Sequence, residues 1–202
     1  KSDRGSFNLK GIASDDYPNL PFVESGTSLD INPSVFLEAL KLTMFSSSND
    51  ESKQLLTGVN FKFKDKSLES AATDGHRLAV VLNSEGEKFS KLEMIDNSNN
   101  ADDYLSVTIP TRSLREIEKL VNTKINEEAI KLFYDKGQVV FISSNQIITT
   151  RTLEGSYPNY SQLIPDSFSR IFKFERNSLI NSLERIAVLA DQQSSVVKIN
   201  IN

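Results

Sequence analysis

The sequence predicts an α+β protein in which two helices back an antiparallel sheet. Three observations lead to this prediction: strand-like segments in which apolar and polar residues alternate, two amphipathic helical segments, and an order of elements that occurs twice. Both occurrences have the order βαβββ. The complete domain is therefore expected to be a duplication of one motif, with both helices on one side of the strands.

The first copy of the motif begins with a strand at Thr27. Its elements are expected at 27–31 (strand), 33–45 (helix), and 55–64, 67–73 and 77–82 (strands). Alternation supports these strands, because Val59, Phe61 and Phe63 would face one side while the polar residues between them face the other.

The second copy follows the same order. Its elements are expected at 104–109 (strand), 111–121 (helix), and 128–134, 138–143 and 147–153 (strands). Residues typical of turns separate the strands in both copies, namely Asp65-Lys66, Asp74-Gly75, Lys136-Gly137 and Asn145-Gln146. The polar segment 83–103 is expected to be an exposed connection between the two copies.

A longer repeat relates the two ends of the chain. Tyr17-Pro18-Asn19 returns 140 residues later as Tyr157-Pro158-Asn159. Each copy precedes a predicted strand, a capping Asn and an amphipathic helix. Asn32 and Asn177 are the predicted caps, because an Asn side chain accepts hydrogen bonds from the free amides of a first turn, and Pro33 suits the first helical position.

A repeat of this length indicates duplicated domains rather than a solenoid. The second copy predicts a strand at 170–174 followed by a helix at 178–190. The chain is therefore expected to contain the end of one domain (1–24), one complete domain (25–165) and the start of a third (166–202).

Composition limits the function classes that need to be considered. The 202 residues contain 23 basic and 27 acidic side chains, a net charge of −4, and no cysteine. The absence of cysteine excludes disulfides, thiolate metal sites and a cysteine nucleophile. With no long apolar run and no signal-peptide pattern, a cytoplasmic protein is expected. The charge argues against a nucleic-acid binder that is basic all over, but it allows one basic face.

Eight residues around the single histidine carry the most specific signal: Ala72-Thr73-Asp74-Gly75-His76-Arg77-Leu78-Ala79. Asp74-Gly75 is typical of a hairpin turn, because Gly accepts positive φ and Asp hydrogen-bonds its own downstream backbone. The turn would present an imidazole and a guanidinium at the end of a hairpin.

In this order and between two strands, the octet resembles the corresponding segment of the bacterial sliding clamp family, the β subunit of DNA polymerase III. The tandem βαβββ domain is similar to the DNA-clamp fold, so the resemblance covers the chain from Gly11 onward. Members of this family have three such domains and close head to tail as dimeric rings around duplex DNA. The resemblance implies a central fragment: the tail of the first clamp domain, the complete middle domain and the start of the third.

The resemblance also implies what the protein does. It implies a processivity factor that encircles double-stranded DNA and tethers the replicative polymerase and repair proteins, without catalysis, cofactor or membrane. The implied partners are duplex DNA, peptides of the replicative polymerase, of the clamp loader and of repair polymerases, and a second copy in the full-length homodimer. The implied location is the cytoplasm, at the nucleoid.

The charge pattern of helix 111–121 suits such a role. Leu114, Ile117 and Val121 fall on one stripe that would pack on the sheet, while the basic residues fall on another. Plain solvation of an exposed helix face is the alternative. In a clamp, however, both helices line the central hole. Lys and Arg side chains there would contact the phosphates of the DNA backbone without recognising the base sequence. The residues expected to face DNA are Lys41, Lys53, Arg112, Arg115 and Lys119.

The family also implies a pocket for partner peptides between the second and third domains. Its motif positions correspond here to Leu56, Thr73, Gly75, His76, Arg77, Leu78, Pro158, Gln162 and Leu163. The leucines offer apolar surface, while His76 and Arg77 suit polar groups at the rim. Gln162 departs from the basic residue common at its position in the family, which leaves no charge-assisted contact there. The alternative for the leucines is that they are core residues.

Two other function classes remain as alternatives. A hydrolase could use His76 with Asp74 and one of the many serines, or Asp102-Asp103 as a metal or acid pair. The sequence, however, has no Gly-x-Ser-x-Gly elbow, P-loop or second histidine. An adaptor module without DNA contact is the other alternative. The discriminating feature is whether the basic helix faces collect on one side.

Overall fold

A computed structural model describes residues 8–17, 26–64, 67–83, 93–94, 104–123, 129–143, 146–188 and 197–200. The chain divides into two compact units, Lys1–Pro158 and Asn159–Asn202, and each is described by itself. Within the described ranges, no helix has both the length and the apolar character needed to cross a membrane. The predicted turn pair Asp65-Lys66, Asn145 of the pair Asn145-Gln146, residues 18–19, and Asp102-Asp103 lie outside the described residues.

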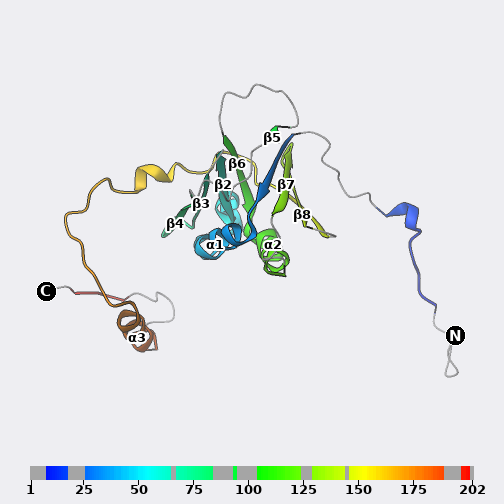
Figure 1. Cartoon of the computed structure of the whole chain (residues 1–202). Helices are drawn as coiled ribbons and strands as arrows, with labels where there is room; N and C mark the ends of the chain where they lie inside the picture. Colours follow the sequence, from blue (N-terminus) through cyan, green and yellow to red (C-terminus); the bar gives the residue numbers. More distant parts are fainter. Residues whose placement is uncertain are drawn as a thin grey trace. The chain divides into compact units, whose positions relative to one another are not determined.

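The first unit contains two α-helices and nine strands among its described residues (Figure 1). The first copy of the motif supplies β1 (Thr27–Ile31), α1 (Pro33–Thr43), β2 (Gly58–Lys64), β3 (Ser67–Thr73) and β4 (Leu78–Asn83). The second copy supplies β6 (Tyr104–Pro110), α2 (Thr111–Thr123), β7 (Ile130–Asp135), β8 (Gln138–Ser143) and β9 (Gln146–Arg151). The predicted order of elements is confirmed in both copies, and the α+β class with it.

The strands form two antiparallel sheets rather than the single sheet expected. One has the order β5-β1-β7-β8-β9 and the other β4-β3-β2-β6. Each copy therefore gives its first strand to the other copy's sheet, since β1 pairs with β7 and β6 pairs with β2. Alternation predicts which face of a strand is buried but not which strand lies beside it, so this exchange could not be read from the sequence.

Three phenylalanines hold the two sheets and the first helix together. The ring of Phe36, from α1, lies 5.5 Å from that of Phe61 in β2 and 5.7 Å from that of Phe141 in β8. All three side chains are buried, within a core cluster to which both helices and both sheets contribute. α1 and α2 pack against each other on the same side of the sheets (Figure 1).

The predicted start of the first helix is confirmed by its cap. Asn32 Oδ1 accepts hydrogen bonds from the backbone N–H groups of Ser34 (3.0 Å) and Val35 (3.3 Å), and Pro33 occupies the first position. The predicted strand 55–64 is shorter than expected, because residues Glu51–Thr57 form a 3₁₀ segment and β2 starts at Gly58. A side chain at Gly58 would meet Ile109 O at 2.7 Å, so the strand begins where two backbones pass closely.

Within the predicted exposed connection 83–103, the structure places a short strand. β5 (Glu93–Met94) pairs with β1 at the edge of the larger sheet. A two-residue strand has too little alternation to be recognised in a polar sequence.

Among its described residues, the second unit has a 3₁₀ turn at Tyr160–Leu163 and one α-helix, α3 (Arg176–Ala187). The predicted strand 170–174 is wrong: these residues are exposed and have no regular structure, and Ile171 is 78% exposed. A strand needs a neighbour, and the described part of this unit supplies none. The predicted cap is also wrong, because Glu175, not Asn177, accepts hydrogen bonds from the first free amides of α3.

Candidate functional site

The turn between β3 and β4 is closed by the side chain of Asp74. Its Oδ1 accepts hydrogen bonds from the backbone N–H groups of His76 (2.9 Å) and Arg77 (3.0 Å), and its Oδ2 accepts one from Arg77 Nε at 3.0 Å. These two backbone donors, with Arg77, hold the pKa of the Asp74 carboxyl below its usual value. The carboxylate is thus occupied by the turn and by Arg77 rather than by the imidazole, which disfavours the hydrolase alternative.

Thr73 and Gly75 complete the turn. Thr73 Oγ1 donates to Arg77 O at 2.7 Å and accepts from the Gly75 N–H at 3.1 Å. Gly75 has φ +94°, and the nearest atom to a side chain placed there would be Lys53 Nζ at 4.0 Å. Backbone conformation, not crowding, therefore requires glycine, and the surface above it is open.

Arg77 is held at a second point by an aromatic ring. Its guanidinium carbon lies 5.8 Å from the centre of the Phe45 ring, within the range of a cation–π interaction. Phe45 follows α1 in the 3₁₀ turn Met44–Ser46 and is 59% exposed. Nothing in the sequence pattern singles out Phe45, which is expected there only as the last residue of a helix.

A second segment of the same unit packs against this hairpin. The hydroxyl oxygen of Tyr157 accepts a hydrogen bond from the backbone N–H of Thr73 at 3.0 Å. Burial raises the pKa of the Tyr157 hydroxyl, and the Thr73 bond opposes this only in part. Gly155, with φ +113°, brings the chain so close to Leu55 that an added Cβ would lie 3.1 Å from its Cδ1.

The structure therefore brings together three of the segments that carry the predicted pocket residues. The hairpin supplies the residues from Thr73 to Leu78, the 3₁₀ segment Glu51–Thr57 contains Leu56, and Pro158 directly follows Tyr157. Gln162 and Leu163 belong to the second unit, where both are exposed. Leu56 and Leu78 are half-buried and Leu163 is 69% exposed, and none of them belongs to the core cluster.

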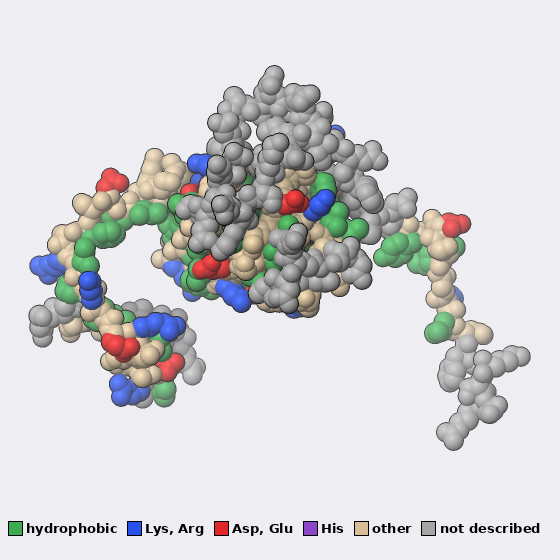
Figure 2. Space-filling model, viewed as in Figure 1, with side chains coloured by type: hydrophobic (Ala, Val, Ile, Leu, Met, Phe, Trp, Pro, Cys, Tyr) green, Lys and Arg blue, Asp and Glu red, His purple; other side chains and the backbone are tan. Residues whose placement is uncertain are grey.

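The basic residues of α2 point away from the core, as its two stripes predict. Leu114, Ile117 and Val121 are buried, whereas the residues expected to face DNA on this helix are exposed: Arg112, Arg115 and Lys119. Lys41 is likewise exposed on α1, which packs against α2. Figure 2 shows Lys and Arg side chains along the lower edge of the folded part, where these helices lie in Figure 1.

The same helix surfaces also carry acids, so the face is mixed rather than purely basic. Lys119 Nζ lies 2.9 Å from a carboxylate oxygen of Glu116, and both side chains are largely exposed. Glu38 is exposed on α1 as well. Lys53 lies beside the hairpin turn, since its Nζ is the atom nearest to Gly75.

Comparison with known proteins places this geometry in a family. Residues 30–159 match the family described as the central domain of the DNA polymerase III beta subunit. The beta sliding clamp of Synechococcus elongatus is 42% identical over 98% of this chain, and that of Synechocystis is 46% identical over 97%. The chain spans about half the length of the curated relatives it matches, 50% in both cases.

Solved structures agree with the sequence comparison. The beta chain of DNA polymerase III from Streptococcus pneumoniae is 32% identical, with a TM-score of 0.75 over 94% of this chain and 46% of that one. The Helicobacter pylori beta clamp bound to a DNA ligase peptide is 22% identical, with a TM-score of 0.78 over 94% of this chain and 49% of that one. At 22% identity, the similarity to the Helicobacter pylori clamp shows only that the two proteins share a fold.

Proposed function

Because the chain belongs to the DNA polymerase III β-subunit family, we propose that it acts in a sliding-clamp processivity factor. In this proposal it contributes its first unit to a ring that encircles duplex DNA, and partner proteins are tethered through short peptides. The family match over residues 30–159 is the observation that carries the proposal, because this range contains both the basic helix face and the hairpin turn.

The helix face suits contact with DNA that must not be tight or sequence-specific. Lys41, Arg112, Arg115 and Lys119 are exposed on adjacent helices and so are available to phosphate oxygens, which carry no sequence information. The acids Glu38 and Glu116 between them reduce the net attraction. A mixed face of this kind holds the duplex weakly at each point, while closure of the ring prevents escape. No bond is made or broken in this function.

The hairpin side suits a partner peptide. Gly75 leaves the backbone accessible, His76 and Arg77 are exposed at the rim, and Leu56 and Leu78 offer half-buried apolar surface. The Helicobacter pylori beta clamp, which has the same fold, is solved with a DNA ligase peptide; this supports a peptide partner but does not locate it on the hairpin. Lys53, beside Gly75, is proposed for the peptide side rather than for DNA.

Peptide binding in a full-length clamp that carries these residues tests the partner site. Gly75→Glu and Leu163→Ala are each expected to weaken a Gln-Leu-x-Leu-Phe peptide more than about tenfold, or ~1.4 kcal/mol. Gly137→Glu is the matched control for the first, because Gly137 is also a turn glycine with positive φ (+79°). Leu82→Ala, at 62% exposure against 69% for Leu163, is the control for the second. If both site variants bind like the parent, the pocket assignment is wrong.

Salt dependence in the same clamp tests the DNA face. Replacing Arg112, Arg115 and Lys119 by Ala is expected to reduce the slope of log K against log salt by about one unit for each phosphate that is no longer neutralised. The control pair Lys131→Ala with Arg151→Ala removes exposed basic residues from the larger sheet. A slope that falls no further in the triple variant than in this control would refute the helix face as the DNA lining.

A further inference from the structure

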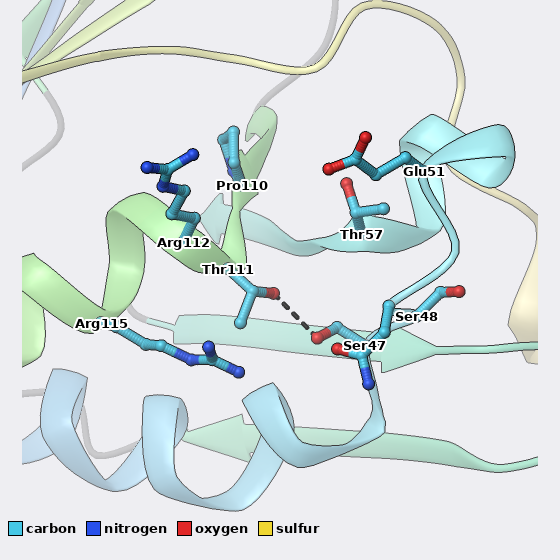
Figure 3. Close-up of a pocket in the computed structure, with 9 residues that line it drawn as sticks. Ser47, Ser48, Glu51, Thr57, Pro110, Thr111, Arg112 and Arg115 are labelled. Carbon is cyan, nitrogen blue, oxygen red and sulfur yellow. Dashed lines mark hydrogen bonds between the residues drawn. The ribbon is translucent and has the colours of Figure 1, made fainter.

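A cleft of about 200 Å³ opens where the first turn of α2 meets the chain that follows α1 (Figure 3). It lies within the first unit, on the side of α2 that carries the basic residues. Its lining residues are Ser47, Ser48, Asn49, Glu51, Thr57, Pro110, Thr111, Arg112 and Arg115. It is smaller than the clefts of about 300–1,000 Å³ that hold drug-sized ligands, so it suits a small polar group.

Two hydroxyl groups lock the floor of this cleft. Ser47 Oγ donates to the carbonyl oxygen of Met44 at 2.8 Å, because a carbonyl can only accept. The Ser47 proton is thus used, so the 2.9 Å bond to Thr111 must take its proton from Thr111 Oγ1. Both side chains are buried, at 8% and 6% exposure, and the bond between them is drawn in Figure 3. The floor is therefore fixed in place but has no proton left to offer a ligand.

The walls of the cleft supply the donors. Arg112 and Arg115 are exposed and have no ion pair among the described residues. Figure 3 shows the Arg115 side chain reaching toward the Ser47–Thr111 pair, whereas Arg112 extends away from it. Ser48 Oγ accepts from the Asp50 N–H at 3.0 Å, and its own proton makes no bond within the described structure. A guanidinium fork and a hydroxyl donor together match the oxygens of a phosphate.

One wall residue opposes an anion. Glu51 is the only carboxylate among the lining residues, and in Figure 3 it lies on the wall across from Arg112. Its negative charge lowers the affinity of the cleft for any phosphate, and two arginines against one glutamate leave the lining with an excess of positive charge.

We propose that this cleft seats one backbone phosphate of nucleic acid, held by Arg115 and Ser48, with Asn49 at its edge and Arg112 adding positive charge. The inference rests on the proposed function and deepens it, because it makes one of the DNA contacts a fixed site on a locked floor. Ser47 and Thr111 are positioning residues in this site. They hold the chain after α1 against α2, where Ser48 and Arg115 both line the cleft.

Inorganic phosphate and the 202-residue chain give a direct test. Titration of phosphate into ¹⁵N-labelled protein at constant ionic strength is expected to shift the backbone amides of residues 47–49 and 111–115 and few others. Arg115→Ala is expected to raise the half-saturation concentration at least fivefold, and Glu51→Gln to lower it. Lys131→Ala is the matched control, because it removes one exposed positive charge from β7, outside the cleft lining, and is expected to change nothing.

A second arm identifies the source of the phosphate. At low salt, Arg115→Ala is expected to weaken binding of a 20-base-pair duplex at least fivefold, and Ser47→Ala to weaken both phosphate and duplex. Phosphate shifts that spread over all basic residues overturn the seat. Site-specific phosphate shifts with unchanged duplex binding overturn the assignment to nucleic acid, because the cleft then takes free phosphate. In either case a slope test with Lys41→Ala and Lys119→Ala, which leaves the cleft residues in place, decides the proposed function separately.

Discussion

The hydrogen bond between Tyr157 and Thr73 gives the sharpest test of how the hairpin is held. Tyr157→Phe removes one oxygen and keeps the ring, so packing is retained while the Thr73 N–H loses its acceptor. Thr73 is only 8% exposed, and the bond is 3.0 Å long. A buried donor left without a partner costs about 1–3 kcal/mol. For a unit of this size, each kcal/mol lost lowers the melting temperature by roughly 2–4 °C.

Hydrogen exchange of the Thr73 amide measures this cost at the bond itself. A loss of about 1–3 kcal/mol corresponds to roughly 5- to 150-fold faster exchange. Tyr17→Phe is the matched control, because Tyr17 belongs to the first copy of the Tyr-Pro-Asn repeat and is 76% exposed. Unchanged exchange at Thr73 in Tyr157→Phe would refute the claim that this bond anchors the hairpin.

The raised pKa of Tyr157 adds a pH dependence with a definite sign. Burial favours the neutral phenol in the folded state, so the unfolded chain loses this proton first as the pH rises. The stabilising contribution is therefore complete below a pH of about 10 and is lost as the pH rises through the folded pKa. Tyr157→Phe should abolish this alkaline loss, as measured by urea unfolding between pH 8 and pH 11.

Three further predictions concern single positions. Gly26→Ala should lower the free energy of unfolding by about 3 kcal/mol, measured with urea, because Gly26 has φ +109° and a Cβ there would overlap Tyr134 O. Phe36→Ala should lower it by about 3–5 kcal/mol, because its ring contacts a buried ring in each sheet. Asp74→Asn should remove a pH dependence of the turn. Because the pKa of Asp74 is lowered in the folded state, the wild-type turn loses stability as the pH falls below about 4. Hydrogen exchange of the Arg77 amide measures this loss.

Much of the fold could be predicted because local signals and tertiary packing agree. The strand Ser67–Thr73 has the predicted boundaries, and all three residues of the predicted apolar stripe of α2 are buried. The errors occur where a neighbour, not the local sequence, decides the structure. Residues 170–174 are rich in the apolar residues of a strand, yet no partner strand is present among the described residues of their unit.

The candidate site was predictable only in the part that depends on local chemistry. Asp74-Gly75 has the residues that such a turn requires, and the structure gives Asp74 the backbone role assigned to it. Phe45 and Tyr157 could not be identified as part of the site, because their roles depend on contacts with Arg77 and Thr73 across the fold. The Tyr-Pro-Asn repeat is the one sequence signal that points to Tyr157. It singles out this tyrosine but does not show which residue the tyrosine contacts.

The exchange of first strands explains why the two copies of the motif form one unit. Neither copy can complete a sheet alone, because β1 pairs with β7 and β6 with β2. A further link joins the sheets after β9, where the Leu153 N–H donates to Thr108 O in β6 at 2.8 Å. Gly58 lies at the same place, and a Cβ there would come within 2.8 Å of Leu153 Cδ1. The helix face and the hairpin are therefore carried by one shared core, so disruption of either copy weakens the support of both surfaces.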